Sequence, residues 1–154
     1  FAEGSDAAAV VERLDYVLRP ASDAAPAAPA TASPAPAEAA PAPDATRRLL
    51  PDERLLFRYS SITDNPHRIH YDLAYATQQE GYPALVVNGS LPAMFLLEMF
   101  RQHAGREPQT LTTRNLAPMF CGRPLRLNVL RDSAGWRLWA EDEGGRATLD
   151  ARAT

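Results

Sequence analysis

The segment from Ser90 to His103, SLPAMFLLEMFRQH, places the strongest constraint on how this chain can fold. Helical spacing distributes its large apolar side chains over most of the circumference of a helix: Leu91, Met94, Phe95, Leu96, Leu97, Met99 and Phe100. Ser90 is a suitable N-cap, and Pro92 is accepted in the first helical turn. Because a helix that is apolar on nearly all sides must be buried on nearly all sides, the remaining chain has to form a layer that covers it.

Three segments after this helix alternate apolar and polar residues, as half-buried strands do: PLRLNVLRD, GWRLWAEDE and RATLDARAT. Tight-turn sequences separate them, at residues 132–135 and 143–145. An earlier segment, TLTTRNLAPMF, is a further strand candidate. Strands joined by tight turns form an antiparallel meander, and packing it around the apolar helix buries both elements. The sequence therefore predicts an α+β fold with an antiparallel sheet wrapped around one long buried helix, which is the outline of the hotdog fold.

A segment rich in alanine and proline, Ala21–Thr46, divides the chain. It contains thirteen Ala and six Pro, and it has no large apolar residue to bury. Proline interrupts helices and favours extended polyproline II conformations, so we predict a linker without regular structure. We therefore expect three parts: residues 1–20, the linker 21–46, and a folded domain over residues 47–154.

The segment in front of the linker is too short to fold by itself. Alternating Leu14, Tyr16 and Leu18 predict a strand. Val10 and Val11, together with Leu14, fit one side of a helix, which remains the alternative. Either element would have no local partner, so we expect this segment to be the tail of an earlier domain.

The composition argues against several classes of function and location. The formal net charge is -3 and no basic run occurs, which argues against a nucleic-acid surface. The single cysteine, Cys121, cannot form an internal disulfide, which fits a cytosolic protein. No window approaches 18 consecutive apolar residues, so no membrane span is predicted.

Two of the chain's three histidines lie in a polar segment, TDNPHRIHYDLAYA (Thr63–Ala76). The segment before it, RLLFRYSSI, places Phe57 and Tyr59 in alternation and predicts a strand. Asn before Pro favours a turn, and Asp72 is placed to cap a short segment, Leu73–Gln79. From these residues alone, the polar segment fits both a surface loop and an active site.

The segment FRYSSITDNPHRIHYDLAYATQQEGYPALVVNGSLPAMFLL resembles the MaoC-like hydratase/dehydratase family, with HRIHYD and EGYPALVV as its most specific strings. The similarity is to the branch of mesaconyl-CoA hydratase-like proteins and the mitochondrial 3-hydroxyacyl-thioester dehydratase. It extends over Leu55–Thr154 and includes RNLAPMFCGRPL. Members of this branch are often double hotdogs joined by an Ala/Pro-rich linker. The resemblance thus implies a C-terminal half, with residues 1–20 as the tail of a missing N-terminal half.

The general motif of this family is an Asp, four further residues and a His, followed by x-Asp. Here His70 and Asp72 match its second part. Asn65 stands at the first position, where this branch often carries Asn, and Asp64 precedes it. Because neighbours in an extended chain point to opposite sides, the resemblance favours Asn65 and His70 as catalytic residues, with Asp64 in reserve.

A second family signature is a His-Gly pair that opens the buried helix, and here the pair is Asn88-Gly89. The resemblance implies that Gly89 N–H stabilises negative charge on a thioester oxygen, and that a residue without a side chain lets the thioester approach closely. His70 would move the proton, either alone or together with Asp64 or His67, and Asn65 would hold the water or hydroxyl. The residues expected to contact the substrate are Asp72, Asn88 and Ser90.

The implied activity is that of an acyl-thioester hydratase or dehydratase, a carbon–oxygen lyase acting reversibly on an enoyl-CoA or 3-hydroxyacyl-CoA, mesaconyl-CoA-like substrates included. Neither a metal nor a cofactor is implied. Expected partners are the acyl-CoA substrate and either the missing N-terminal hotdog half or a second copy in a homodimer. The expected location is the bacterial cytoplasm or the mitochondrial matrix. The alternative is a non-catalytic lobe that binds an acyl thioester or only supports a double-hotdog assembly; a thioesterase shares the fold but finds no support in these motifs.

Overall fold

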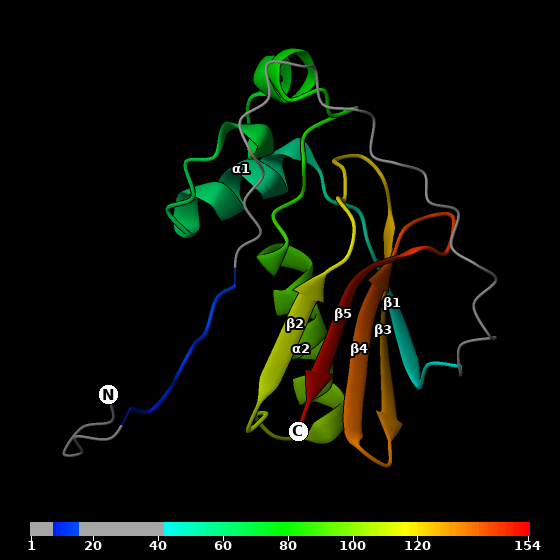
Figure 1. Ribbon diagram of the computed structural model, residues 1–154. Helices are drawn as coiled ribbons and strands as arrows, with labels where there is room; N and C mark the ends of the chain where they lie inside the picture. The colour runs from blue at the N-terminus through cyan, green and yellow to red at the C-terminus, as the bar shows by residue number, and fades with distance from the viewer. Residues whose placement is uncertain (1–7, 16–41) are drawn as a thin grey trace.

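The computed structural model describes residues 8–15 and 42–154 (Figure 1). The regular elements are β1 (Ala45–Leu49), α1 (Glu53–Ile62), a 3-10 turn (Arg68–His70), a π-helical turn (Tyr75–Gln79), α2 (Ser90–Ala104), β2 (Leu111–Asn115), β3 (Leu125–Asp132), β4 (Gly135–Glu141) and β5 (Ala147–Ala153). Figure 1 shows α1 and the short helical turns gathered beyond one end of the sheet, whereas α2 runs alongside the strands. The polar segment with the two histidines therefore lies at the end of the sheet where α2 begins.

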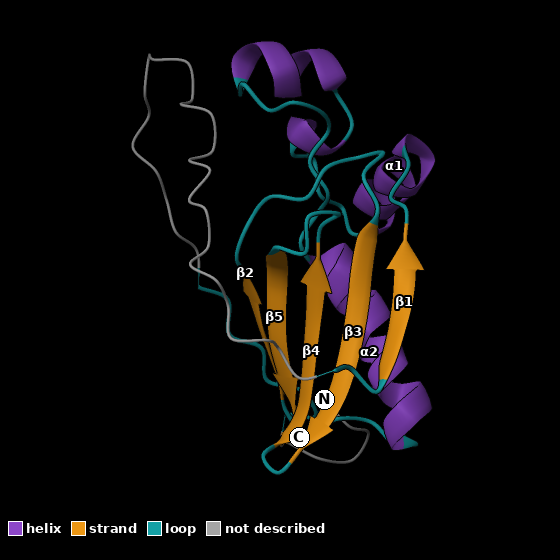
Figure 2. Cartoon of the chain, turned by 90° about the vertical axis from the view of Figure 1, so that its right-hand side faces the viewer, coloured by secondary structure: helices purple, strands orange, loops and turns teal. Residues whose placement is uncertain are grey.

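The five strands form one sheet in the order β1-β3-β4-β5-β2, and every neighbouring pair is antiparallel. Leu138 of β4 is opposite Val129 of β3 and Ala151 of β5, and all three side chains are buried. Figure 2 shows α2 lying across one face of the sheet. The predicted α+β class, the antiparallel β3-β4-β5 meander and the central helix are confirmed.

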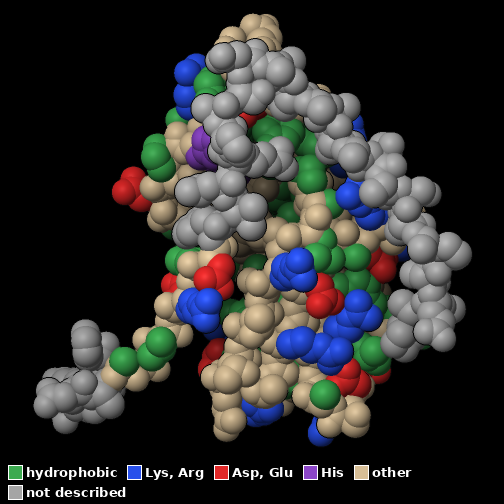
Figure 3. Space-filling view, in the orientation of Figure 1, with side chains coloured by type: hydrophobic (Ala, Val, Ile, Leu, Met, Phe, Trp, Pro, Cys, Tyr) green, Lys and Arg blue, Asp and Glu red, His purple; other side chains and the backbone are tan. Residues whose placement is uncertain are grey.

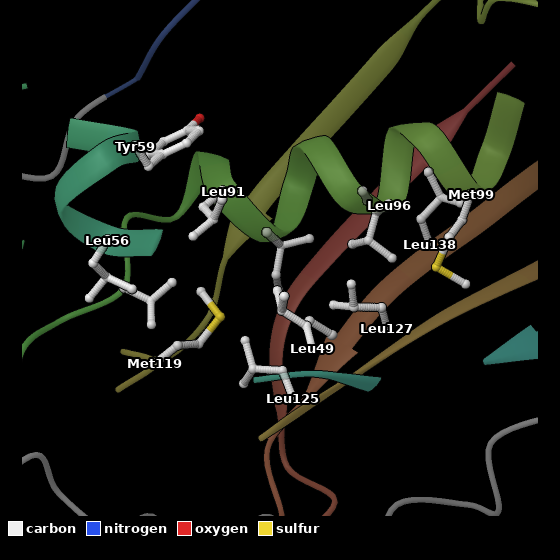
Figure 4. Close-up of a cluster of buried hydrophobic side chains, with 14 of the residues drawn as sticks. Leu49, Leu56, Tyr59, Leu91, Leu96, Met99, Met119, Leu125, Leu127 and Leu138 are labelled. Atoms are coloured by element: carbon white, nitrogen blue, oxygen red, sulfur yellow. The ribbon is translucent and has the colours of Figure 1, made fainter. Parts of the chain in front are cut away.

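The main hydrophobic core lies between α2 and the sheet (Figure 4). Leu96 of α2 points towards Leu127 and Leu138 of the sheet. Phe100, on the next turn of α2, is 0% exposed and meets Trp136 edge to face with 5.7 Å between ring centroids. Full burial of an apolar side chain of this size contributes roughly 1.5–3 kcal/mol, so this layer holds the helix on the sheet.

The burial of α2 differs from the prediction, because only the face towards the sheet and α1 is fully covered. Leu96 is 1% exposed, whereas Met94, expected in the core, is 54% exposed. The helix also begins differently, since Gly89 occupies the N-cap position and Ser90 is the first helical residue. Apolar composition on all sides does not show which sides the rest of the chain can reach.

The segment RLLFRYSSI, predicted as a strand, forms helix α1. Asp52 caps its first turn, because its Oδ1 accepts a hydrogen bond from Leu55 N at 2.7 Å. Leu56 and Tyr59, three residues apart, are both buried beside the start of α2 (Figure 4), whereas Phe57 is 62% exposed. A short apolar segment fits the period of a strand as well as that of a helix. Here the Asp52 cap and the helical spacing of the buried residues favour the helix.

The N-terminal boundary of the folded domain also differs slightly. Residues 8–15, part of the segment for which a strand or a helix was expected, form neither. The rest of that segment and linker residues 21–41 lie outside the described residues. β1 begins at Ala45, two residues before the predicted boundary at 47, because its pairing with β3 extends to Val129. Within the described residues, no helix has the length and apolarity needed to cross a membrane.

Candidate active site

A cavity of about 410 Å³ opens where α2 begins. Three parts of the chain form its walls: the 3-10 turn, the segment before α2, and the end of β2 with the residues that follow. The lining residues are His67, Ile69, His70, Val86, Val87, Gly89, Asn115, Leu116, Ala117, Pro118 and Met119. Figure 3 shows a histidine side chain at the surface of the helical part of the molecule, beyond the end of the sheet. A largely apolar cavity with a few convergent polar groups is the usual form of a small-molecule site.

His70 is buried in the wall of this cavity, with 7% of its surface exposed. Its Nδ1 lies 2.8 Å from Val86 O. Because a carbonyl oxygen only accepts hydrogen bonds, Nδ1 carries the proton of the neutral ring and Nε2 keeps a free lone pair. Val86 is itself held in place, since its N–H donates to Ile69 O at 2.9 Å. The fold thus fixes the tautomer in which Nε2 is the base.

The surroundings of His70 also keep it uncharged. Burial lowers the pKa of His70, and the neighbouring His67, 5.7 Å away between ring centroids, acts in the same direction. The hydrogen bond to Val86 O opposes this change in pKa without reversing it. His70 is therefore a neutral imidazole at pH 7, ready to accept a proton.

Gly89 lines the same cavity at the N-terminus of α2. Among the described residues, no backbone group accepts a hydrogen bond from its N–H. A Cβ on Gly89 would lie 2.4 Å from Asn115 Nδ2 and 2.6 Å from Asn115 Oδ1. The side-chain amide of Asn115 thus rests directly on Gly89, and any larger residue at position 89 would push the end of this side chain aside. The φ of Gly89 is -60°, a value that any residue adopts, so the backbone conformation itself does not require glycine.

We predict that Gly89→Ala lowers the free energy of unfolding by less than about 1 kcal/mol, because the added Cβ meets only the end of the Asn115 side chain, which lies on the exposed strand β2 and can shift. The loss comes from the collision with the Asn115 amide. Adding Asn115→Ala removes the colliding atoms and should restore most of the lost stability. Thermal or urea unfolding of the two single variants and the double variant measures this coupling.

Gly144→Ala is a matched control, because its added Cβ would meet Asp142 Oδ1 only at 3.4 Å. Gly144→Ala should change the free energy of unfolding less than Gly89→Ala. Strictly additive effects of Gly89→Ala and Asn115→Ala would contradict the contact.

Asn65 and Asp64 do not line the cavity. Asn65 Oδ1 accepts a hydrogen bond from His67 N at 3.1 Å, and Asn65 N donates to Ser60 O at 2.9 Å. Asp64 is exposed and has a positive φ of 49°, as residues in turns after helices often do. The structure therefore brings His70 and Gly89 together, while Asn65 shapes the turn that leads to them.

The three residues expected to contact the substrate are engaged within the protein. Asp72 forms an ion pair with Arg68 at 2.7 Å and accepts a hydrogen bond from Tyr75 N at 3.0 Å, which makes it a cap. Asn88 Oδ1 accepts from Ser90 N at 3.1 Å and from Ser90 Oγ at 2.7 Å. These contacts engage the Asp72 carboxylate, Asn88 Oδ1 and Ser90 Oγ.

Tyr59 continues the second of these networks, because its hydroxyl donates to Ser90 Oγ at 2.9 Å. It ties α1 to the first turn of α2 and so helps to position Gly89. In the part of the chain that the structure describes, no group of three His, Cys, Asp or Glu side chains is placed to hold a metal ion.

The cavity residue that sequence analysis missed is Asn115. It lies in the string RNLAPMF, which the sequence marks as part of a strand and of the family resemblance but not as part of the site. All residues of the edge strand β2 are exposed, so no alternation of burial distinguishes this position. Only the three-dimensional contact with Gly89 identifies it.

The antiparallel sheet, its central helix and the cavity at the helix N-terminus define a hotdog-fold protein. A solved structure of the R-hydratase PhaJ1 from Pseudomonas aeruginosa superimposes with a TM-score of 0.60. The match covers 71% of this chain and 76% of that one at 19% sequence identity, which shows the shared fold.

The sequence family is also defined. The family model described as "Hydroxyacyl-thioester dehydratase type 2" matches residues 2–121, and the chain belongs to this family. It is 45% identical over 143 residues to the mesaconyl-C(4)-CoA hydratase of Chloroflexus aurantiacus, covering 93% of this chain and 45% of that protein. It is 35% identical over 89 residues to the mitochondrial hydroxyacyl-thioester dehydratase type 2 of Schizosaccharomyces pombe, covering 56% of this chain and 30% of that protein. The predicted family and branch are confirmed, and the chain spans less than half the length of these relatives.

Proposed function

We propose that the protein catalyses the reversible addition of water to a 2-enoyl thioester of coenzyme A, acting as a hydratase or dehydratase. The observation that carries the proposal is the position of His70 and Gly89 in one cavity, the first with a free Nε2 and the second at the N-terminus of α2. The family and the named relatives, a mesaconyl-C(4)-CoA hydratase and a hydroxyacyl-thioester dehydratase, support the same chemistry.

His70 supplies the acid–base function. In the hydration direction, Nε2 takes a proton from water while the water oxygen bonds to the β-carbon of the enoyl group. The electron pair of the double bond moves towards the carbonyl and forms an enolate. The imidazolium then returns the proton to the α-carbon, which restores neutral His70 and gives the 3-hydroxyacyl thioester. A positioned acid–base group of this kind contributes about 10²–10⁴-fold in rate.

Gly89 supplies the electrostatic function. Negative charge develops on the thioester oxygen as the enolate forms, and a backbone N–H can stabilise this charge by donating a hydrogen bond to the oxygen. The N-terminus of α2 carries the positive end of the helix dipole, which favours the same charge. Several apolar residues around the cavity lower its polarity, so this interaction is stronger than it would be in water.

We propose that the intact enzyme is a double hotdog in which this chain is the C-terminal, catalytic half. The named relatives are more than twice as long as the part that matches here. The Ala/Pro-rich composition of residues 21–46 suits a connection between two such halves. Acyl-CoA is the proposed substrate, with mesaconyl-like acyl groups included because of the 45% identical relative.

A test of the proposed function uses the full-length protein and a short 2-enoyl-CoA. Loss of the absorbance of the conjugated enoyl thioester, with formation of the 3-hydroxyacyl-CoA, is the expected result. Binding without turnover would favour the alternative of a non-catalytic lobe, for which Asn65 and Asp64 outside the cavity lining are the supporting observation. Release of free CoA from a saturated acyl-CoA would indicate a thioesterase instead.

The choice between Asn65 and Asp64 gives a separate prediction. We expect Asn65→Ala to lower the hydration rate several-fold, because the Asn65 side chain orders the turn that carries His67 and His70. Asp64→Ala should leave the rate nearly unchanged, because its side chain is exposed and does not line the cavity. Steady-state kcat and KM of both variants measure the difference. A loss for Asp64→Ala as large as that for a His70 variant would show that Asp64 is the second catalytic residue.

A further inference from the structure

We infer that Asn115 is a catalytic residue whose side-chain amide, together with Gly89 N–H, forms a two-donor site for the thioester oxygen. The inference rests on the proposed function and adds a group from a different element that lines the cavity. His70 and Gly89 come from the chain between α1 and α2, whereas Asn115 is the last residue of β2.

Distance is the first argument. Asn115 Nδ2 lies 2.4 Å from the position that a Cβ on Gly89 would take. That position and Gly89 N share one bonded Cα and are about 2.5 Å apart, so Nδ2 is within about 5 Å of Gly89 N. Two donors that each bind one oxygen at about 2.9 Å are themselves separated by about 4–5 Å. One oxygen can therefore accept hydrogen bonds from both groups.

The free hydrogen-bonding capacity of Asn115 is the second argument. Its backbone is fixed by the pairing of β2 with β5, opposite Leu149. Its side-chain amide, in contrast, makes no hydrogen bond to any other residue in the described part of the chain, although Asn88 nearby in the same region makes two. An amide that packs against Gly89 and faces a cavity keeps both N–H groups available for a ligand.

The third argument is chemical. Sites that stabilise an oxyanion commonly combine a backbone N–H with a second donor, and side-chain amides serve in that role. With Gly89 N–H alone, the enolate oxygen would have one protein donor. Asn115 Nδ2–H supplies the second without bringing a positive charge that would compete with His70 for protons.

The decisive variant is Asn115→Asp in the full-length protein. Aspartate has the same shape and packs on Gly89 in the same way, but as a carboxylate it only accepts hydrogen bonds. We expect kcat for hydration to fall at least about 10²-fold, the lower end of the range for a lost oxyanion donor. KM should change much less than kcat, because the interaction strengthens only as charge develops. Asn115→Ala should cause a similar loss, and it serves as the second variant.

Arg114→Ala is the matched control. Arg114 precedes Asn115 on the exposed strand β2, its side chain points to the opposite side, and it does not line the cavity. The kcat of Arg114→Ala should equal that of the wild type. A spectroscopic measurement separates a catalytic role from a structural one: bound dienoyl-CoA should absorb at longer wavelength when its carbonyl is polarised. This red shift should shrink in Asn115→Asp and Asn115→Ala and persist in Arg114→Ala.

Wild-type kcat together with an unchanged red shift in Asn115→Asp would overturn the inference and leave the proposed function standing. A wild-type protein that neither hydrates an enoyl-CoA nor shifts the absorbance of dienoyl-CoA would overturn both. The two failures are therefore distinguishable in one set of measurements.

Discussion

Replacing His70 by alanine should lower the rate of enoyl-CoA hydration at least about 10²-fold, the range for loss of one positioned acid–base group. The reason is that His70 Nε2 is the free ring nitrogen in the cavity, while Nδ1 is committed to Val86 O. Steady-state kinetics of the full-length variant measure the loss. His103→Ala is the matched control, because His103 is exposed in the last turn of α2 and does not line the cavity.

The pH dependence of the wild type checks the same assignment. The base must be neutral to accept a proton, and burial lowers the pKa of His70. The hydration rate should therefore remain high below pH 6.5, the ordinary pKa of histidine, and fall only when His70 itself becomes protonated. A rate that declines already above pH 6.5, or an equal loss in His103→Ala, would contradict His70 as the base.

Phe100→Ala should have the largest effect on stability, about 3–5 kcal/mol in the free energy of unfolding. The Phe100 ring is 0% exposed, lies between α2 and the sheet, and contacts Trp136 edge to face. Its removal leaves a cavity in the layer that joins the two parts of the fold. Urea unfolding measures the change.

Phe57→Ala is the matched control for this prediction, because the same atoms are removed from a side chain that is 62% exposed. It should alter the free energy of unfolding by less than about 1 kcal/mol, as most surface substitutions do. Equal costs at the two positions would show that the core is not centred on the contact between α2 and the sheet.

The elements that the sequence predicts well are those whose apolar residues follow one strong period. The apolar residues that alternate along β3, β4 and β5, such as Leu127, Leu138 and Leu149, are buried as the sequence predicts. Asn128, Trp139 and Thr148, at intervening positions, are buried as well. The prediction of a strand at α1 is wrong because the apolar residues of this segment fit the periods of both a strand and a helix, and the Asp52 cap is the signal that favours the helix. The exposed side of α2 at Met94 could not be predicted, since it depends on what the rest of the chain can reach.

The candidate site shows a similar division. His70 and Gly89, which both line the cavity, were predicted from motifs, because both lie in one continuous segment of the chain that the family motifs cover. The hydrogen bond between His70 and Val86 O joins residues sixteen positions apart, and no local sequence pattern predicts it. Asn115 comes from a different element altogether, and its proximity to Gly89 depends on how β2 lies beside the start of α2.

The contact between Gly89 and Asn115 has an evolutionary consequence. Since the backbone at position 89 would accept any residue, the space for a side chain there is limited by Asn115 and not by the conformation of Gly89 itself. A larger residue at position 89 would either displace the Asn115 side chain or occur together with a smaller residue at position 115. The two positions, 26 apart in the numbering of the chain (115 minus 89), should therefore vary as a pair among related sequences. Replacing the amide at position 115 would also change how the thioester oxygen is bound. We therefore expect substrate preference to vary together with this pair of residues.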